Sequence, residues 1–485
     1  MLLDFAHIPR TFRHNGKTLN TAAQSNPRSA QTRELSRELG ASHATAVVVG
    51  TIIGSGIFLV PAEMMQSVGT AGLVYLAWVV GGVLSFMGAL TYAELGAMKP
   101  DAGGEYVYLR DAYGPLAGFL YAWTTFLISK PGSIATIVTG MVRMLGGFHT
   151  FSFLPKPVLT IGSFAVTWGQ AVAIAMVLFV SLINYLGVKK AGEFQLFFTL
   201  LKIGIIFGVI VLGFTAAKGG WSNFGSQFEG ARGGLVGFAV ALLAALWAYD
   251  GWNNLNMVAG EVRNPGRNVP ISLILGVGIV AALYMLLNAA VQYVMPASAV
   301  AGAERPASDA VGIALGAGAA SLFIGFMAFQ MLATLNGTVL SGARVPFAAA
   351  RDGSFVKSLA AVHPRFHTPS TAIVFQAGLA VAFILFAGNF QQLFSITLFA
   401  EWLFYMLTST TIFVFRRREP NAVRPYKTWG YPALPAIFIL ASAVLLYYTF
   451  TSSLKNSLAG MVIIVAGIPV YLFFSWWNRR NFQPA

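Results

Sequence analysis

The chain has 485 residues, of which 56% are hydrophobic and only 10% are charged, and its formal net charge is +14. Soluble proteins carry about a quarter charged residues, so this composition indicates a polytopic membrane protein. The absence of cysteine excludes disulfides, iron–sulfur clusters, thiolate metal sites and a disulfide-linked accessory subunit. The positive charge gathers in particular segments, as described below, so we expect a membrane-facing role for it and no nucleic-acid partner.

The first 43 residues form a polar segment without the continuous apolar run of a signal peptide. We interpret 1–43 as a mostly disordered cytoplasmic tail.

Twelve apolar segments of spanning length follow, which predicts an all-α integral membrane protein with twelve transmembrane helices. Their approximate limits are 44–67, 70–97, 114–146, 163–187, 193–215, 234–260, 269–296, 311–341, 369–387, 391–415, 431–451 and 457–477. Most of the 31 Lys and Arg residues fall in the tail, in every second loop and at the C-terminal end. By the positive-inside rule, both termini are therefore expected to be cytoplasmic, in a multi-pass protein of the cell (plasma) membrane.

The first apolar segment is interrupted near its middle by Gly54-Ser55-Gly56. Ten residues of helix from Ala44 rise ~15 Å, which places this interruption near the bilayer midplane. Backbone groups freed there cannot face lipid, so they must face protein, water or a ligand. The alternative interpretation is a small-residue patch for helix packing.

The sixth apolar segment is interrupted in a similar way, by the polar run Asp250-Gly251-Trp252-Asn253-Asn254. The first and sixth segments are corresponding members of two five-helix sets, 44–215 and 232–416. Broken helices at corresponding positions of two halves are typical of inverted-repeat secondary transporters. Helices 11 and 12 (429–478) and a cytoplasmic C-terminal tail (479–485) complete the expected organisation.

The two breaks offer complementary backbone groups. The half-helix beginning near Ser55 and Gly56 presents free N–H groups and a positive dipole end, which suit a carboxylate. Carbonyl groups near Ile52, Ile53 and Trp247 suit an ammonium group. Together they predict a site for the backbone of an α-amino acid, with no cofactor and no metal.

Asp250, Lys202, Glu401 and Lys130 are ionisable residues inside apolar segments, where charge is costly. Asp250 is either a counter-charge for a cationic side chain or a structural acid. Lys202 is either a fixed cation that holds the broken first helix through its carbonyl groups or a lysine that reaches the interface. Glu401 is a candidate proton carrier or gate, with a buried hydrogen-bonded acid as the alternative. Lys130, which precedes Pro131, is interpreted as a kink or packing feature.

With these residues in view, the chain resembles the amino acid–polyamine–organocation superfamily and, within it, the L-type amino-acid transporter branch. The resemblance covers about 44–480 and rests on several ordered motifs: Gly50-Thr51-Ile52-Ile53-Gly54-Ser55-Gly56-Ile57-Phe58, Gly103-Gly104-Glu105-Tyr106, Trp247-Ala248-Tyr249-Asp250-Gly251-Trp252-Asn253, Glu261-Val262-Arg263-Asn264-Pro265, Asn336-Gly337, Arg344, Arg351-Asp352-Gly353, His363-Pro364 and Arg424-Pro425-Tyr426.

The resemblance implies a leucine-transporter-type fold with a 5+5 inverted repeat, in which helices 1 and 6 are broken. It implies that N–H groups of Ser55 and Gly56 bind the substrate carboxylate, and that carbonyl groups of Ile52 and Trp247, and Asp250, bind the amino group. Trp247 would be the aromatic gate. Lys202 matches a lysine that stands in for sodium, so transport should be sodium-independent.

Two departures from the branch sharpen these expectations. Asp250 replaces the small residue of many large-neutral transporters, and its surroundings look more like exchangers of neutral and cationic amino acids. Eukaryotic members carry a cysteine for a disulfide to a glycoprotein heavy chain, which this chain lacks, so we expect a stand-alone transporter of a bacterial inner membrane. The expected function is amino-acid exchange by alternating access, with proton-coupled symport as the alternative and enzyme activity not expected.

Overall fold

The structure is a computed structural model that describes residues 35–481, except 147, 163, 387–389 and 453. All of these residues belong to one unit of the chain, Glu34–Ala485. Most of the predicted N-terminal tail and the last four residues of the predicted C-terminal tail lie outside the described residues.

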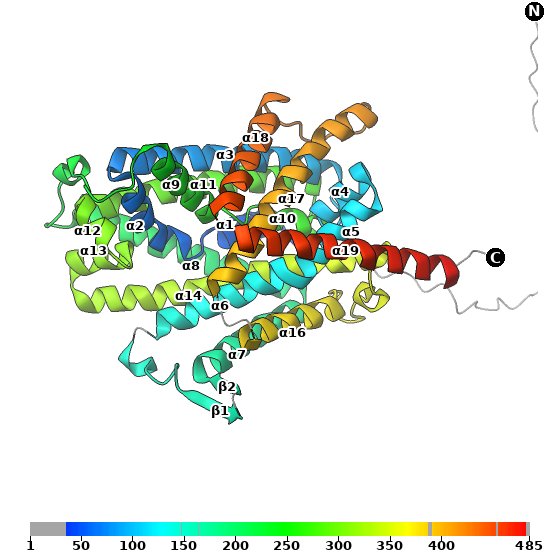
Figure 1. Cartoon of the computed structure of the whole chain (residues 1–485), viewed down its shortest axis with the longest axis horizontal. Helices are drawn as coiled ribbons and strands as arrows, with labels where there is room; N and C mark the ends of the chain where they lie inside the picture. Colours follow the sequence, from blue (N-terminus) through cyan, green and yellow to red (C-terminus); the bar gives the residue numbers. More distant parts are fainter. Residues whose placement is uncertain (1–34, 147, 163, 387–389, 453, 482–485) are drawn as a thin grey trace, which may run out of the picture. The chain divides into compact units, whose positions relative to one another are not determined.

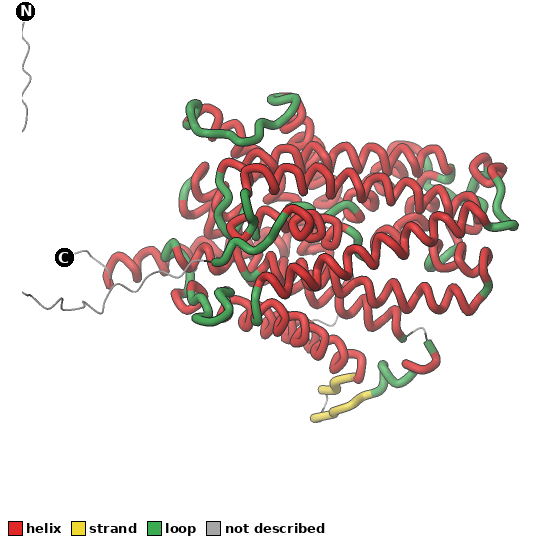
Figure 2. The backbone as a smooth tube through the Cα atoms, turned by 180° about the vertical axis from the view of Figure 1, so that it is seen from behind, coloured by secondary structure: helices red, strands yellow, loops and turns green. Residues whose placement is uncertain are grey.

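Helices form nearly all of the regular structure in the described part of the chain (Figures 1 and 2). They are α1 (Ala41–Ile52), α2 (Gly56–Val68), α3 (Ala71–Met98), α4 (Glu105–Tyr113), α5 (Pro115–Thr124), α6 (Lys130–Leu145), α7 (Trp168–Tyr185), α8 (Val188–Thr215), α9 (Gly234–Ala248), α10 (Asn254–Met257), α11 (Pro265–Val294), α12 (Ala297–Gly302), α13 (Pro306–Leu315), α14 (Ala317–Gly342), α15 (Arg344–Arg351), α16 (Ser370–Phe386), α17 (Phe390–Arg418), α18 (Ala433–Ser452) and α19 (Leu454–Asn481).

A π-helical turn, Thr125–Ser129, joins α5 to α6, and an antiparallel hairpin of β1 (Pro157–Ile161) and β2 (Phe164–Thr167) connects α6 to α7. Short 3₁₀ turns lie at His149–Phe151, Trp221–Gly225, Ala259–Glu261 and Lys357–Ala360. The hairpin is followed directly by α7, whose first turn is fixed by a capping box between Thr167 and Gln170.

Within the described residues, eight helical stretches are long and apolar enough to cross a membrane, and the bent pair α1 and α2 would make nine. Two further apolar helices, α9 and α16, are shorter. The prediction of an all-helical membrane protein is therefore confirmed. The count of twelve spans and the 5+5 repeat stay predictions.

The first break separates α1 from α2 by three residues, and the two helices are bent by 40° relative to each other. Ile53 adopts an extended conformation there, with φ −72° and ψ 92°. The sixth apolar segment breaks after Ala248, where Gly251 has φ +113°, a conformation that favours glycine. A Cβ on Gly251 would lie 3.0 Å from the carbonyl oxygen of Thr51, so the two breaks approach each other at backbone level.

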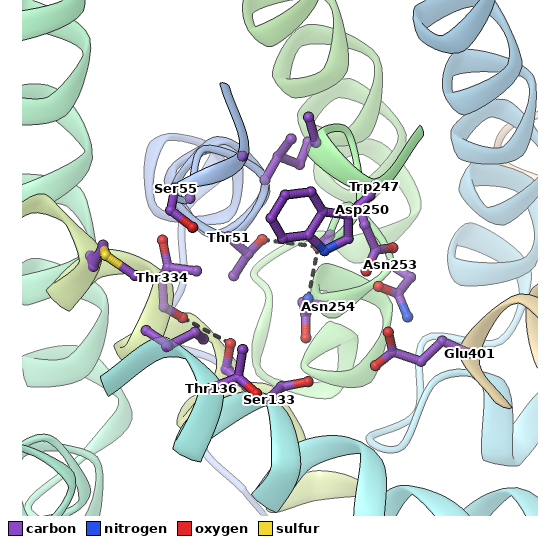
Figure 3. A pocket seen from close by; sticks show the side chains of 18 of the residues that line it. Thr51, Ser55, Ser133, Thr136, Trp247, Asp250, Asn253, Asn254, Thr334 and Glu401 are labelled. Carbon is purple, nitrogen blue, oxygen red and sulfur yellow. Dashed lines mark hydrogen bonds between the residues drawn. The ribbon is translucent and has the colours of Figure 1, made fainter. Parts of the chain in front are cut away.

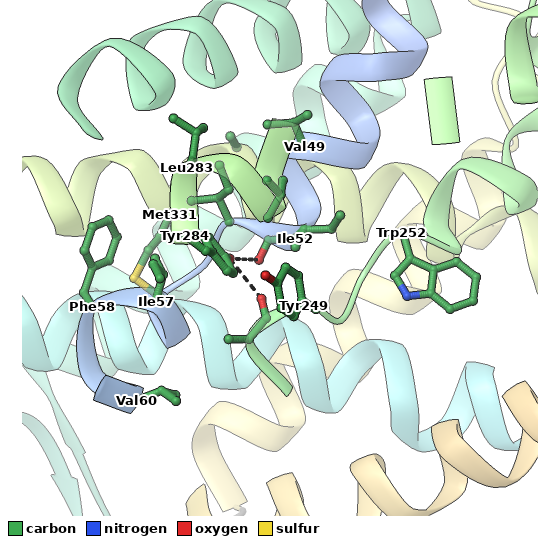
Figure 4. Close-up of a cluster of buried hydrophobic side chains, with 14 of the residues drawn as sticks. Val49, Ile52, Ile57, Phe58, Val60, Tyr249, Trp252, Leu283, Tyr284 and Met331 are labelled. Atoms are coloured by element: carbon green, nitrogen blue, oxygen red, sulfur yellow. Dashed lines mark hydrogen bonds between the residues drawn. The ribbon is translucent and has the colours of Figure 1, made fainter. Parts of the chain in front are cut away.

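The packing of the helices brings the two breaks together. Helix α2 packs on α9, and α1 packs on α8, α10 and α11. Figure 4 shows the buried side chains around this point, where the hydroxyl group of Tyr284 on α11 donates to two helix ends. It bonds to the carbonyl oxygens of Ala248 (2.9 Å) and Ile52 (3.2 Å). One tyrosine therefore links the C-terminal ends of α1 and α9.

Candidate functional site

A cavity of about 160 Å³ lies between the two breaks. Residues of α6, α14 and α17 form the rest of its lining. Its volume suits a small solute. Figure 3 shows the side chains around it, with Ser55 and Glu401 on opposite sides. Six of the predicted site residues line it: Ile52, Ser55, Gly56, Trp247, Asp250 and Glu401. Ile53 and Lys202 do not line this cavity and lie behind its wall.

The N-terminal end of α2 forms one side of the cavity. The N–H groups of the first helical turn have no partner within the helix, and they carry the positive end of the helix dipole. Gly56 lies so close to α9 that a Cβ would be 3.2 Å from Ala248 and 3.4 Å from Cζ3 of Trp247. This end of α2 can therefore offer backbone donors to an anionic group beneath the Trp247 ring.

The C-terminal end of α1 supplies carbonyl groups, some of which already have partners. The carbonyl oxygen of Ile52 accepts one hydrogen bond from Tyr284 and keeps a second lone pair. That of Ile53 accepts from the Lys202 ammonium group and from the Thr334 hydroxyl group. Ile52 thus retains acceptor capacity toward the cavity, whereas Ile53 is engaged on the far side of the wall.

Lys202 is a buried cation on α8 that holds the end of α1. Its Nζ donates to the carbonyl oxygen of Gly50 at 3.0 Å, to that of Ile53, and to the hydroxyl oxygen of Thr334 at 3.2 Å. The side chain is only 1% exposed. Three donors meeting three acceptors compensate much of the cost of burying this charge.

The side of the cavity opposite Ser55 is acidic (Figure 3). Asp250 follows the end of α9, and Glu401 projects from α17. The hydroxyl group of Tyr405, one helical turn after Glu401, donates to Oδ1 of Asp250 at 2.8 Å. The Asp250 and Glu401 side chains thus line the same cavity and act on each other electrostatically.

Lys130, whose place in the sequence favoured a kink or packing feature, also lines the cavity. It is 5% exposed and follows the π-helical turn, a feature often found at functional sites. Its Nζ donates to Oδ1 of Asn254 at 2.7 Å, and the Ser341 hydroxyl donates to the same oxygen at 2.5 Å. A lysine inside an apolar segment can indicate a functional site. The adjacent Pro131 instead favoured a kink or a packing role for Lys130.

Two asparagines of the sixth segment also acquire partners that the sequence did not predict. Asn253 donates to Oε1 of Glu105 at 2.6 Å, and Glu105 is fully buried. Asn254 donates to the carbonyl oxygen of Gly251, which also accepts from Thr51. These bonds fix the irregular backbone of the sixth segment against α1 and α4.

No group of three or more His, Asp or Glu side chains that could hold a metal ion occurs among residues 35–481 as far as they are described. The site is built instead from helix ends, one lysine and two carboxyl groups, a set that can bind a small zwitterion through its charged groups.

Comparison with known proteins likewise leads to amino-acid transporters. A model of the amino acid permease family matches residues 39–474. The chain is 34% identical to the human (Homo sapiens) b(0,+)-type amino acid transporter 1, over 92% of this chain and 89% of that protein. It is 32% identical to the serine/threonine exchanger SteT of Bacillus subtilis (strain 168), over 90% and 96%, and 30% identical to the human cystine/glutamate transporter, over 96% and 90%.

The chain belongs to the amino acid permease family, within the amino acid–polyamine–organocation superfamily. The relatives are named as amino-acid transporters and exchangers, and they include a large neutral amino acids transporter of the mouse (Mus musculus), so the family predicted from the motifs is confirmed. By their names, these relatives are transporters rather than enzymes.

Proposed function

We propose that this protein is a sodium-independent exchanger of neutral and cationic amino acids that works by alternating access. The observation that carries the proposal is the meeting of two broken helix ends at one cavity, donors from α2 on one side and carbonyl groups of α1 and α9 on the other. That arrangement matches the carboxylate and ammonium groups that all α-amino acids share.

The proposed binding pose follows from this arrangement. The substrate carboxylate would lie against the N–H groups of Ser55 and Gly56, and its ammonium group would lie near the carbonyl groups of Ile52 and Trp247. Ile53 would contribute indirectly, because its carbonyl group is held by Lys202. The substrate side chain would then extend toward Asp250, which offers a counter-charge to arginine or lysine.

We infer twelve spans in a 5+5 inverted repeat, with repeats at 44–215 and 232–416, helices 11 and 12 at 429–478, and cytoplasmic tails at 1–43 and 479–485. This organisation is supported by the family and by the correspondence of the two breaks. The protein would act in the cell membrane of a bacterium, without a disulfide-linked partner, since the chain contains no cysteine.

The test is transport by purified protein in liposomes. Vesicles loaded with leucine should take up labelled leucine, serine or arginine, and empty vesicles should not. Uptake that is independent of internal substrate would contradict exchange. The name of the relative SteT, a serine/threonine exchanger, favours exchange over proton-coupled symport. Accumulation of labelled amino acid in empty vesicles under an imposed pH gradient would instead favour symport.

A further inference from the structure

The acidic pair of the cavity consists of Asp250 and Glu401, whose carboxyl groups come from different parts of the chain. Both line the same cavity, and they act on each other electrostatically. Two ionised carboxylates that line one cavity within the membrane repel each other, and one proton on the pair relieves this repulsion. We therefore infer that the pair shares one proton, while the Tyr405 hydroxyl group donates a hydrogen bond to Oδ1 of Asp250 at 2.8 Å.

The charged groups around the acidic pair can be counted. Lys130 on α6 and Glu105 on α4 act on it electrostatically. Lys202 on α8 lies across the first break. The tyrosines that face these acids are Tyr405 on α17, Tyr92 on α3 and Tyr121 on α5. Among these described groups, with the tyrosines neutral and both lysines charged, two lysines and three carboxyl groups give zero net charge only when one carboxyl group carries a proton.

The charge of the substrate changes this balance. A neutral amino acid enters as a zwitterion, adds no net charge, and leaves the pair with its proton. An arginine or lysine adds one positive charge to this cavity within the membrane, where uncompensated charge is costly. Loss of the shared proton restores neutrality and gives the cationic side chain two carboxylates to bind.

We propose that the acidic pair releases its proton when a cationic amino acid binds and recovers one when it leaves. The inference rests on the proposed exchange function. When external arginine exchanges for internal leucine, the proton leaves to the outside as arginine binds. A proton is taken up from the inside as arginine departs. One positive charge moves inward with arginine and one moves outward as the proton, so the exchange is electrically silent.

The experiment uses purified full-length protein in liposomes that contain leucine and a pH-sensitive dye. External arginine should make the lumen more alkaline by about one proton per arginine taken up, whereas external leucine should not. A potassium-diffusion potential should leave the initial rate of arginine uptake unchanged within about twofold, because no net charge moves. Arginine uptake that follows the potential and moves no protons would overturn the inference.

The matched variants are Glu401→Gln and Glu63→Gln, the second on an exposed position of α2. In Glu401→Gln the ratio of protons to arginine should fall from about one to near zero, because an amide cannot give up the shared proton. The ratio is independent of any loss in transport rate. Glu63→Gln should keep the wild-type ratio, and a wild-type ratio in Glu401→Gln would overturn the assignment to this pair.

Calorimetry of the unaltered protein gives a second readout. Arginine binding, measured in two buffers of different ionisation enthalpy, should release about one proton, and leucine binding should release about none. Failure to bind or transport arginine also overturns the inference. Leucine-for-leucine exchange tests the proposed function separately, so the two failures are distinguishable.

Discussion

Lys202 shows how a single buried charge can organise a break in a helix. Its ammonium group meets the carbonyl groups of Gly50 and Ile53, which α1 leaves without helical partners, and the hydroxyl group of Thr334 on α14. The lysine thus joins α8, α1 and α14 at the level of the first break. If α1 moves during transport, either α8 and α14 move with it or these hydrogen bonds break.

Replacing Lys202 with alanine should slow leucine exchange by about tenfold or more. The carbonyl groups of Gly50 and Ile53 lose their ammonium donor, and the single hydroxyl hydrogen of Thr334 can serve only one of them, which leaves the other unsatisfied at a cost of about 1–3 kcal/mol. Exchange would be measured per folded protein in liposomes, with size-exclusion chromatography to verify folding. Lys189→Ala, at an exposed position of the same helix, is the control and should keep the wild-type rate. A fully active Lys202→Ala protein would refute the role of the lysine.

The Asp250 side chain is the residue whose substitution should separate substrates. Asp250→Asn keeps the shape and an acceptor for Tyr405 but removes the counter-charge for a cationic side chain. Arginine and lysine uptake should fall by about tenfold relative to leucine uptake, as for loss of a charge-assisted contact. Competition of unlabelled amino acids against labelled leucine measures this ratio, with the exposed Asp309→Asn as control. Unchanged competition by arginine would remove Asp250 from the pocket.

At the scale of elements, the close approach of α1 and α8 depends on a glycine. A Cβ on Gly50 would lie 2.2 Å from Nε2 of Gln195 and 2.4 Å from Oγ1 of Thr199. Both of these side chains donate to the carbonyl oxygen of Ala46, at 3.2 Å and 3.1 Å. The glycine therefore lets α8 bond directly to the backbone of α1.

Gly50→Ala should destabilise the protein by about 1–3 kcal/mol, because the added methyl group overpacks this contact and displaces polar groups from the Ala46 carbonyl. Thermal unfolding in detergent, followed by intrinsic fluorescence, should show a lower midpoint. Gly204→Ala on α8 is the matched control, since a Cβ there meets nothing within 4 Å. Equal midpoints for the two variants would show that the contact can relax.

At the scale of the whole molecule, the two breaks act as one structural unit. The Thr51 hydroxyl on α1 donates to the carbonyl oxygen of Gly251 at 2.9 Å, and Tyr284 on α11 bonds to both Ile52 and Ala248. Helices from both halves of the chain therefore fix the geometry of one cavity. Movement of this unit relative to α6, α14 and α17 would open and close the cavity.

Replacement of sodium by choline should leave exchange unchanged within about twofold, because the Lys202 ammonium group already occupies the carbonyl groups behind the first break. The measurement is leucine exchange in liposomes prepared with each salt at equal ionic strength. Potassium replacement is the control for effects of ionic strength. A sodium-dependent rate would show that another cation site contributes.

The sequence alone determined the class of protein and predicted where its site would lie. Its composition requires a membrane environment. The interruptions at Ser55 and Asp250 leave backbone N–H and C=O groups without helical partners, and lipid cannot satisfy these groups. Helix polarity, which follows from chain direction, assigns donors to the start of α2 and acceptors to the end of α1. These are local properties, and six of the predicted site residues do line one cavity.

Only the tertiary structure decided which groups meet. Lys130 contacts Asn254, Tyr405 contacts Asp250, and the Ile53 carbonyl is held from α8, all across more than a hundred residues of chain. Several long helices, such as α3, α8 and α16, carry little hydrophobic asymmetry, and a helix that is apolar all round can face lipid or protein equally well. Helix packing alone therefore places Lys130 at the cavity and brings the Asp250 and Glu401 carboxyl groups together, because sequence spacing does not specify which helix faces meet.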